Sequence, residues 1–158
     1  MVAHLTMPAR LTAERFGAEM VAAGGDFTVL SDTEAARDGA LPEEKLLVAL
    51  RSSALHSWQP PGGGAVGALS HAVIHALDVS ITLGRPAPDP APAVLAVLAQ
   101  LTAADGAVFG VALTGLRVEA ADSGWTWGGG AVVRADSGLL VALVAGRTLP
   151  DGRALRRT

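Results

Sequence analysis

The sequence predicts an α+β fold, in which a helical first part is followed by a small αβ part. Up to Ala104 the apolar residues recur at helical spacing in four segments. After Gly106 the pattern changes to short strand-like runs that are separated by turn residues. Half of the 158 residues are hydrophobic and 17% are charged, which is enough apolar material for a buried core. The predicted domains are therefore residues 1–104 and 105–158.

Composition excludes several classes of protein. The net charge of −3 gives no electrostatic basis for binding nucleic acid or an anionic membrane. The chain has no cysteine, so a cysteine nucleophile is excluded and a metal site would use histidine, carboxylate or water ligands. The first residues lack a basic segment followed by an apolar one. We therefore expect no signal peptide and a cytoplasmic protein.

The first helix is expected over Leu11–Leu30. Thr12 is a candidate N-cap, although Arg15 stands three residues later and so no capping box forms. Gly24 and Gly25 are expected to break or kink this helix.

The second helix is expected over Pro42–Trp58. Pro42 suits a position in the first turn, and the two glutamates that follow it favour the positive end of a helix. The apolar stripe of this helix consists of Leu46, Leu47, Leu50 and Leu55.

The third helix is expected over Ala65–Leu83, between the break QPPGGG (Gln59–Gly64) and Gly84. A membrane helix over this span would have to bury two histidines and an aspartate. We therefore interpret the span as a core helix of a soluble protein. A stiff proline-rich linker, Arg85–Pro92, leads to a short apolar helix over Ala93–Ala104.

The αβ part is expected to begin with a strand over Val111–Asp122. A turn sequence, Asp122-Ser123-Gly124, precedes a return strand that begins at GWTW. The stretch AVVR (Ala131–Arg134) is a candidate third strand.

The last predicted helix follows this third strand. Asp136 is its candidate N-cap, and the helix is expected to run through Ala145 and to stop at Gly146. The tail, Asp151–Thr158, is expected to be loose.

Two histidines, His71 and His75, lie four residues apart on the third predicted helix. At about 100° per residue they share a narrow stripe with Asp78, and the rest of the helix is apolar nearly all round. Such a helix is usually buried, and a buried polar stripe needs partners because each unpaired group costs about 1–3 kcal/mol. Three interpretations stay open: a solvated stripe, two hydrogen-bonded core histidines, or two ligands of one metal ion. The metal interpretation carries the most weight. It requires a third ligand from another element, with Asp78 as an outer hydrogen-bond acceptor or as a ligand itself.

The two remaining histidines are His4, in VAHLT, and His56, in LHSWQPPGGG. Taken alone, each is an ordinary helix or surface histidine.

Four stretches of the chain, taken in order, resemble one family. They are VAHLT, the helix that ends in HALDVSITLGRP, the stretch FGVALTGLRVEAADSGWTWGGGAVV, and LLVALVAGRTLP. Together they resemble the actinobacterial mycothiol-dependent maleylpyruvate isomerase family, which has the DinB-like metalloenzyme fold. The likeness covers most of the chain and implies a four-helix bundle followed by a small αβ C-terminal domain.

The resemblance also implies a site and a chemistry. A divalent metal, commonly zinc, would be held by His4, His71 and His75, and Arg147 would bind a substrate carboxylate. Mycothiol would be the cofactor for isomerisation or S-transfer on a small electrophilic substrate that bears a carboxylate. Because the chain has no cysteine, the thiol must come from outside.

The sequence departs from the family at its start. Family members carry a helix before the VAHL motif, whereas only three residues precede His4 here, so the bundle is expected to be N-terminally shortened. Three explanations are open: a misassigned start, a partner subunit in place of the helix, or a degenerate paralogue. A shortened bundle exposes an apolar face, which predicts a homodimer. His56 is the reserve third ligand if His4 is too mobile. The alternative function is a non-catalytic, oligomeric DinB-like domain with or without bound metal.

Overall fold

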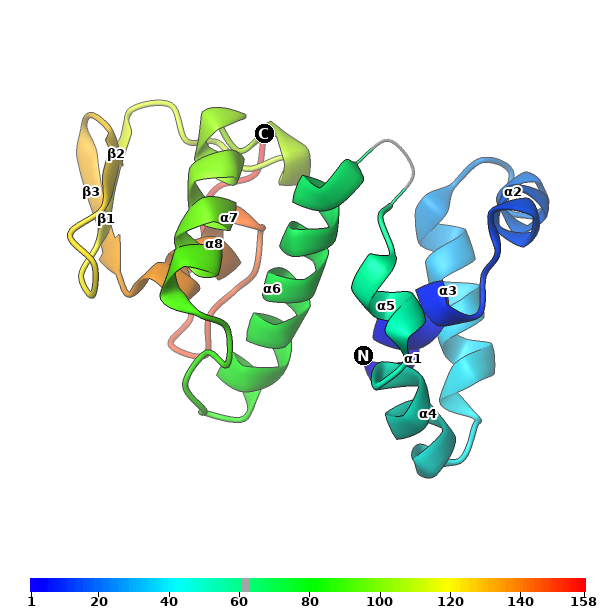
Figure 1. Cartoon of the computed structure of the whole chain (residues 1–158). Helices are drawn as coiled ribbons and strands as arrows, with labels where there is room; N and C mark the ends of the chain where they lie inside the picture. The colour runs from blue at the N-terminus through cyan, green and yellow to red at the C-terminus, as the bar shows by residue number, and fades with distance from the viewer. Residues whose placement is uncertain (61–62) are drawn as a thin grey trace. The chain divides into compact units, whose positions relative to one another are not determined.

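The computed structural model of the chain describes residues 1–60 and 63–158, and it is of mixed α+β class, as predicted (Figure 1). Pro61 and Gly62, in the middle of the predicted break QPPGGG, lie outside the described residues. The chain divides into two compact units, Met1–Gly64 and Ala65–Thr158. The boundary between the two units thus falls between residues 64 and 65 of the sequence, whereas the predicted domain boundary falls between residues 104 and 105.

The first unit is helical throughout its described secondary structure. Its helices are α1 (Val2–Thr6), the short 3-10 helix η1 (Met7–Ala9), α2 (Ala13–Ala22), α3 (Phe27–Gly39), α4 (Glu43–Leu50) and α5 (Ser53–Ser57). Helix α1 packs against α3 and α4.

The helix predicted over Leu11–Leu30 is divided, because α2 ends at Ala22 and α3 begins at Phe27, and the break falls at the two glycines where a break or kink was expected. Gly24 and Gly25 have φ values of 64° and 82°, which a glycine adopts without strain, so the chain turns here instead of kinking. Asp26 then starts α3, since its carboxylate accepts hydrogen bonds from two backbone N–H groups of the first turn. The predicted cap at the start of α2 is confirmed, because the Thr12 hydroxyl accepts from the Arg15 N–H at 3.2 Å.

The single helix predicted over Pro42–Trp58 is wrong, because it is divided into α4 and α5. Pro42 stands at the N-cap of α4, just before the first turn. Ser52 interrupts the helical run, since its hydroxyl accepts from the Ala54 N–H and caps α5. The predicted apolar stripe is only half-buried, and Leu47 remains 38% exposed.

Polar side chains share the interior of the first unit with apolar ones. Among the residues of this unit whose burial the structure describes, the buried apolar side chains are Ala3, Met7 and Leu30, and the buried polar ones are Thr6, Ser31, Glu34 and Asp38. Arg10 pairs with Asp38 and also donates to the Thr6 hydroxyl at 3.1 Å, which ties α1 to α3. The buried Glu34 carboxylate pairs with Arg37 on the same helix.

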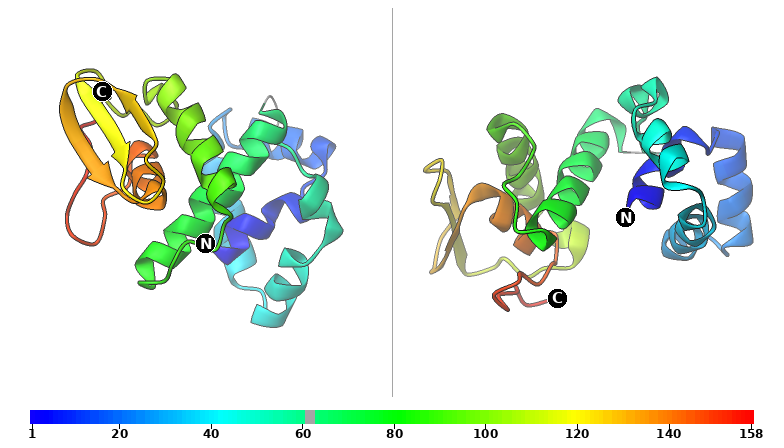
Figure 2. Two further views of the ribbon diagram at one scale, coloured as in Figure 1. Left: turned by 60° about the vertical axis from the view of Figure 1, so that its left-hand side comes forward. Right: turned by 90° about the horizontal axis from the view of Figure 1, so that it is seen from below.

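The second unit contains three longer helices and a small sheet. Its elements are α6 (Gly64–Thr82), α7 (Ala91–Ala103), the 3-10 helix η2 (Ala107–Phe109), β1 (Leu116–Ala120), β2 (Thr126–Gly128), β3 (Ala131–Ala135) and α8 (Ser137–Val144). The strand order is β2-β1-β3, with β1 antiparallel to β2 and parallel to β3. Val118 of β1 lies opposite Trp127 and Val133. Figure 2 shows the three strands as one layer, with α8 beside it.

One apolar core holds the second unit together. It is built from α6, α7, α8 and the inward face of the sheet. Val97, Leu98, Val118, Leu140 and Val141 have no exposed surface in it. Burial of this kind is the main favourable term in folding, so these four elements form one structural body.

Helices α6 and α7 match the predicted helices to within two residues at each end. Pro92, predicted in the linker, instead lies in the first turn of α7, where its missing N–H leaves no hydrogen bond unmade. The strand predicted over Val111–Asp122 is wrong in its first half, since β1 begins only at Leu116.

The C-terminal tail is docked on the second unit, so the prediction of a loose tail is wrong. Val111 forms an antiparallel bridge with Arg157, and the Ala112 N–H donates to the Arg156 carbonyl at 2.9 Å. The Arg157 guanidinium donates to the carbonyls of Phe109 and Gly146. These partners lie far back in the sequence, and local composition therefore gave no sign of them.

Helix α6 is also the one described helix that is long and apolar enough to cross a membrane, judged by length and composition alone. The core helix of a soluble protein passes the same test, and Val73, Ile74 and Leu77 of α6 lie in the core of the second unit.

Candidate metal-binding site

Helix α6 fixes the position of the predicted histidine pair. The helix ends in a Schellman motif, in which the Arg85 N–H donates to the Ser80 carbonyl at 2.8 Å and Gly84 adopts a φ of 62°. Its buried face, which includes Val73 and Leu77, packs into the core and sets the rotation of the helix about its axis. The stripe of His71, His75 and Asp78 consequently lies at the margin of the buried face, and these three side chains are half-buried.

The structure brings His71 and His75 together. Their ring centroids are 4.7 Å apart, and the rings meet edge to face with an interplanar angle of 79°. Two imidazoles one helical turn apart can both direct a ring nitrogen at a single ion. The fully solvated stripe is thereby disfavoured, because both rings are half-buried and in mutual contact.

The orientation of His75 is set by Asp78. The Nδ1 atom of His75 lies 3.0 Å from Oδ2 of Asp78. An ionised carboxylate can only accept, so Nδ1 carries the proton and donates a hydrogen bond to Asp78. In this tautomer of a neutral imidazole the lone pair belongs to Nε2, which is the nitrogen that would coordinate a metal.

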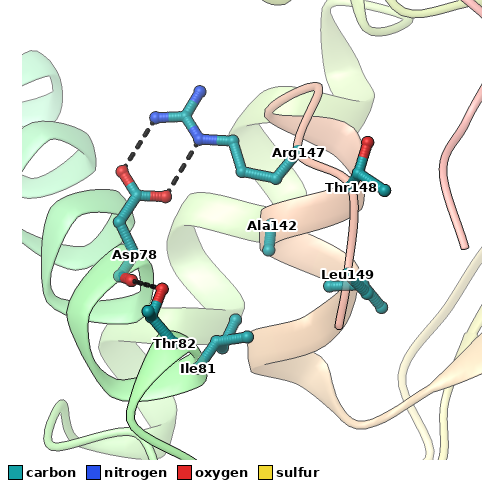
Figure 3. Close-up of a pocket in the computed structure, with 7 residues that line it drawn as sticks. All are labelled: Asp78, Ile81, Thr82, Ala142, Arg147, Thr148 and Leu149. Carbon is teal, nitrogen blue, oxygen red and sulfur yellow. Dashed lines mark hydrogen bonds and ion pairs between the residues drawn. The ribbon is translucent and has the colours of Figure 1, made fainter. Parts of the chain in front are cut away.

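Asp78 is held in turn by Arg147, which lies beyond α8 (Figure 3). The Nε atom of Arg147 donates to Oδ1 and Nη2 donates to Oδ2, each at 2.9 Å. Burial alone would raise the pKa of Asp78, but the hydrogen bonds from His75 and Arg147 outweigh it and hold that pKa well below its ordinary value. The carboxylate is therefore ionised at neutral pH.

Arg147 is placed by the end of α8. Gly146 has a φ of 75°, and the Arg147 N–H donates back to the Ala142 carbonyl at 2.9 Å, which turns the chain toward α6. Its Nη1 donates to the Ala145 carbonyl at 2.8 Å, and its guanidinium carbon lies 5.8 Å from the centroid of the Phe109 ring. The hydrogen bond to Asp78 raises the pKa of Arg147 although burial lowers it, so this arginine stays charged.

A small pocket adjoins this ion pair in the second unit. Figure 3 shows that Asp78 and Arg147 meet on one side of it, where Thr82 also lies. The complete lining is Asp78, Ile81, Thr82, Ala142, Arg147, Thr148 and Leu149.

His4 belongs to the first unit and lies in α1. Its Nδ1 atom is 2.9 Å from the Ser31 hydroxyl of α3, and its side chain is half-buried. His56, the reserve ligand, lies in α5 of the same unit and is exposed.

Sequence reasoning identified the pair and Asp78 because they are close together in the chain. It missed Ser31 as the partner of His4, and it missed the pairing of Arg147 with Asp78, which joins residues 69 positions apart. No periodicity or cap signal relates residues so distant in sequence.

No protein-family model, curated protein or solved structure matches the chain. The resemblance to the mycothiol-dependent maleylpyruvate isomerase family therefore rests on the four stretches quoted above.

Proposed function

We propose that the chain binds one divalent metal ion through His4, His71 and His75. Among the described residues, these histidines are a set of three donors that could hold such an ion. The observation that carries the proposal is the His71–His75 pair, with Nδ1 of His75 on the Asp78 carboxylate. A carboxylate behind a ligating histidine is the usual outer partner in metal sites, because it fixes the tautomer and makes the ring a stronger donor.

The donor set suits zinc. Imidazole nitrogens are favoured zinc ligands, and three protein ligands leave the fourth position of a tetrahedral ion for a small molecule. His4 carries an outer partner of its own, the Ser31 hydroxyl. We therefore propose zinc as the metal, with Nε2 as the ligating atom of both His4 and His75.

The finer proposal is a thiol-dependent isomerase or S-transferase that uses mycothiol. When bound, zinc with an open position lowers the pKa of a coordinated thiol and so supplies a thiolate nucleophile near neutral pH. Arg147 is the proposed contact for the carboxylate of a small electrophilic substrate. Such a substrate would compete for the guanidinium with Asp78, the carboxylate that it now binds.

Metal analysis of single variants tests the ligand set. Protein that is purified without chelator should contain about one equivalent of zinc, and its cobalt form should show the intense visible absorption of a four-coordinate site. We expect His71→Ala and His75→Ala each to weaken zinc binding by more than about 100-fold, which exceeds the loss from an outer partner.

The third ligand is decided by a matched pair of variants in the first unit. His4→Ala should weaken zinc binding about as much as His71→Ala does, whereas His56→Ala should leave it unchanged. The reverse result would make His56 the third ligand. If wild type and the His71→Ala/His75→Ala double variant hold equally little metal, the proposal fails.

The thiol proposal has its own test. Addition of mycothiol to the cobalt form should shift its absorption spectrum if the thiol enters the open position. A protein that binds metal but gives neither this shift nor turnover would be the non-catalytic domain of the alternative hypothesis.

Homodimer formation is also part of the proposal. The first unit has a small apolar interior, while Val21, Phe27, Val29 and Val48 on its surface are each at least 50% exposed. Exposed apolar side chains of this kind favour association. Sedimentation velocity over a range of protein concentrations tests it, and a strictly monomeric chain would contradict it.

A further inference from the structure

The second unit contains a continuous chain of polar contacts that ends on His75. Arg147 binds both oxygens of Asp78, and Oδ2 of Asp78 also accepts from Nδ1 of His75 at 3.0 Å. The contacts cross from the segment after α8 to the stripe of α6 that carries His75. All three residues are partly buried, with side chains that are 33%, 14% and 17% exposed for Arg147, Asp78 and His75.

The geometry points to Arg147 and Asp78 as positioning residues for His75. Asp78 fixes the proton of His75 on Nδ1 and holds the ring plane, and Arg147 holds Asp78 in the rotamer that reaches His75. This inference rests on the proposed metal site, because it concerns the ligand that His75 presents there.

The contacts of Asp78 assign it the role of outer acceptor. The sequence left open whether Asp78 is a ligand or an acceptor. Both of its oxygens accept hydrogen bonds from Arg147, and one of them also accepts from His75, so its lone pairs are directed at protein donors. A carboxylate in this arrangement acts on a metal through the histidine and does not need to touch the ion.

The contacts of Arg147 separate this role from substrate binding alone. Its Nε and Nη2 atoms donate to Asp78, and its Nη1 donates to the Ala145 carbonyl. The two donors on Asp78 form the planar fork that matches a carboxylate, a match that lysine cannot reproduce. Arg147→Lys therefore keeps the charge and removes the feature that orients Asp78.

The first test is the tautomer of His75 in the metal-free protein, read from its ring ¹⁵N shifts at a pH where the imidazole is neutral. Wild type should show the proton on Nδ1. Asp78→Ala should move it to Nε2, the nitrogen that a free imidazole prefers, and Arg147→Lys should give a mixture. Arg153→Lys, which removes an arginine from the exposed Asp151 pair of the same unit, is the matched control and should change nothing.

The second test is zinc affinity, measured by competition with a chromophoric chelator. Asp78→Ala should weaken binding about 10–100-fold, as loss of an outer partner does, and Arg147→Lys should weaken it less. Because Arg147 acts through Asp78, adding Arg147→Lys to Asp78→Ala should cause no further loss.

The inference is overturned if the His75 proton stays on Nδ1 in Asp78→Ala, or if the effects of the two substitutions on zinc affinity simply add. If Asp78→Ala does not fold, Arg147→Lys alone decides, since an unchanged tautomer in that variant removes Arg147 from the chain of contacts. The tautomer is measured without metal, so this test does not depend on zinc binding. A protein that binds no zinc but shows the expected tautomers would contradict the proposed function and still support the role of Asp78 and Arg147 in orienting His75.

Discussion

The fully buried position of Leu98 predicts how much its truncation lowers the free energy of unfolding. Its side chain lies on α7 in the core of the second unit and has no exposed surface, whereas Leu83, just beyond α6, is 67% exposed. Leu98→Ala should lower the free energy of unfolding by about 2–5 kcal/mol, because it removes buried apolar surface and leaves a cavity. The same change at Leu83 should alter it by about 0.5 kcal/mol or less. Urea titration of both variants measures the difference, and equal losses would show that the core is not packed as described.

Two glycines with nearly the same φ allow the cost of backbone strain to be distinguished from the cost of steric overlap. Gly106 and Gly124 have φ values of 74° and 72°. A Cβ atom at Gly106 would lie 2.2 Å from the Val111 carbonyl oxygen, while nothing lies within 4 Å of one at Gly124. Gly124→Ala should cost about 1–2 kcal/mol for the left-handed conformation alone, and Gly106→Ala should cost clearly more. Thermal unfolding tests this expectation, which fails if Gly124→Ala is the more damaging change.

At the scale of elements, the start of α8 is capped from another part of the chain. Asp136 stands at the N-cap as predicted, but its side chain makes no cap hydrogen bond. Asp122 takes this role, since its Oδ1 accepts from the Ser137 N–H at 3.0 Å and from the Ser137 hydroxyl at 2.6 Å. The turn between β1 and β2 thus holds the first turn of the last helix.

This capping predicts a difference between two aspartates. Asp122→Ala should destabilise the protein by about 1 kcal/mol, and Asp136→Ala should have a smaller effect.

Burial would raise the pKa of Asp122, but the hydrogen bonds from Ser137 outweigh it and lower that pKa. A lowered folded-state pKa contributes stability above the unfolded value of about 4, and this contribution is lost as the pH falls through the folded value. The gap between wild type and Asp122→Asn should therefore narrow as the pH falls below the unfolded value. A gap that widens on acidification would contradict the assignment.

At the scale of the whole molecule, the two units differ in how much apolar core each contains. The contiguous core lies within residues Ala65–Thr158, while the buried apolar residues that the structure describes in the first unit are Ala3, Met7 and Leu30. A fragment of residues 63–158 should therefore fold on its own and unfold cooperatively. Circular dichroism and calorimetry of the fragment check this, and a fragment without a thermal transition would show that its core depends on the first unit.

The accuracy of the sequence predictions follows the distance over which each signal acts. The ends of α6 and α7 were predicted closely, because the glycine that follows α6 and the proline-rich segment before α7 act locally. The division of the first predicted helix falls at Gly24 and Gly25, where a break or kink was expected, and Asp26 then caps α3. The division of the second was missed, since Ser52 offered a cap that competed with helix continuation.

The same reasoning explains the candidate site. His71, His75 and Asp78 share one helix, so the periodicity of a helix was enough to place them together. The pairing of Asp78 with Arg147, the docking of Arg157 beside Val111, and the cap from Asp122 all join segments that are distant in sequence. Such contacts are set by how the core packs, and the chain carries no local pattern for them.

The central claim is that the histidine pair of α6 binds a metal ion, and equilibrium dialysis against zinc tests it most directly. Metal-free wild type should take up about one equivalent of zinc per chain. Protein with His71→Ala and His75→Ala together should take up none at the same zinc concentration while keeping its helical circular dichroism. Equal uptake by the two proteins would contradict the account.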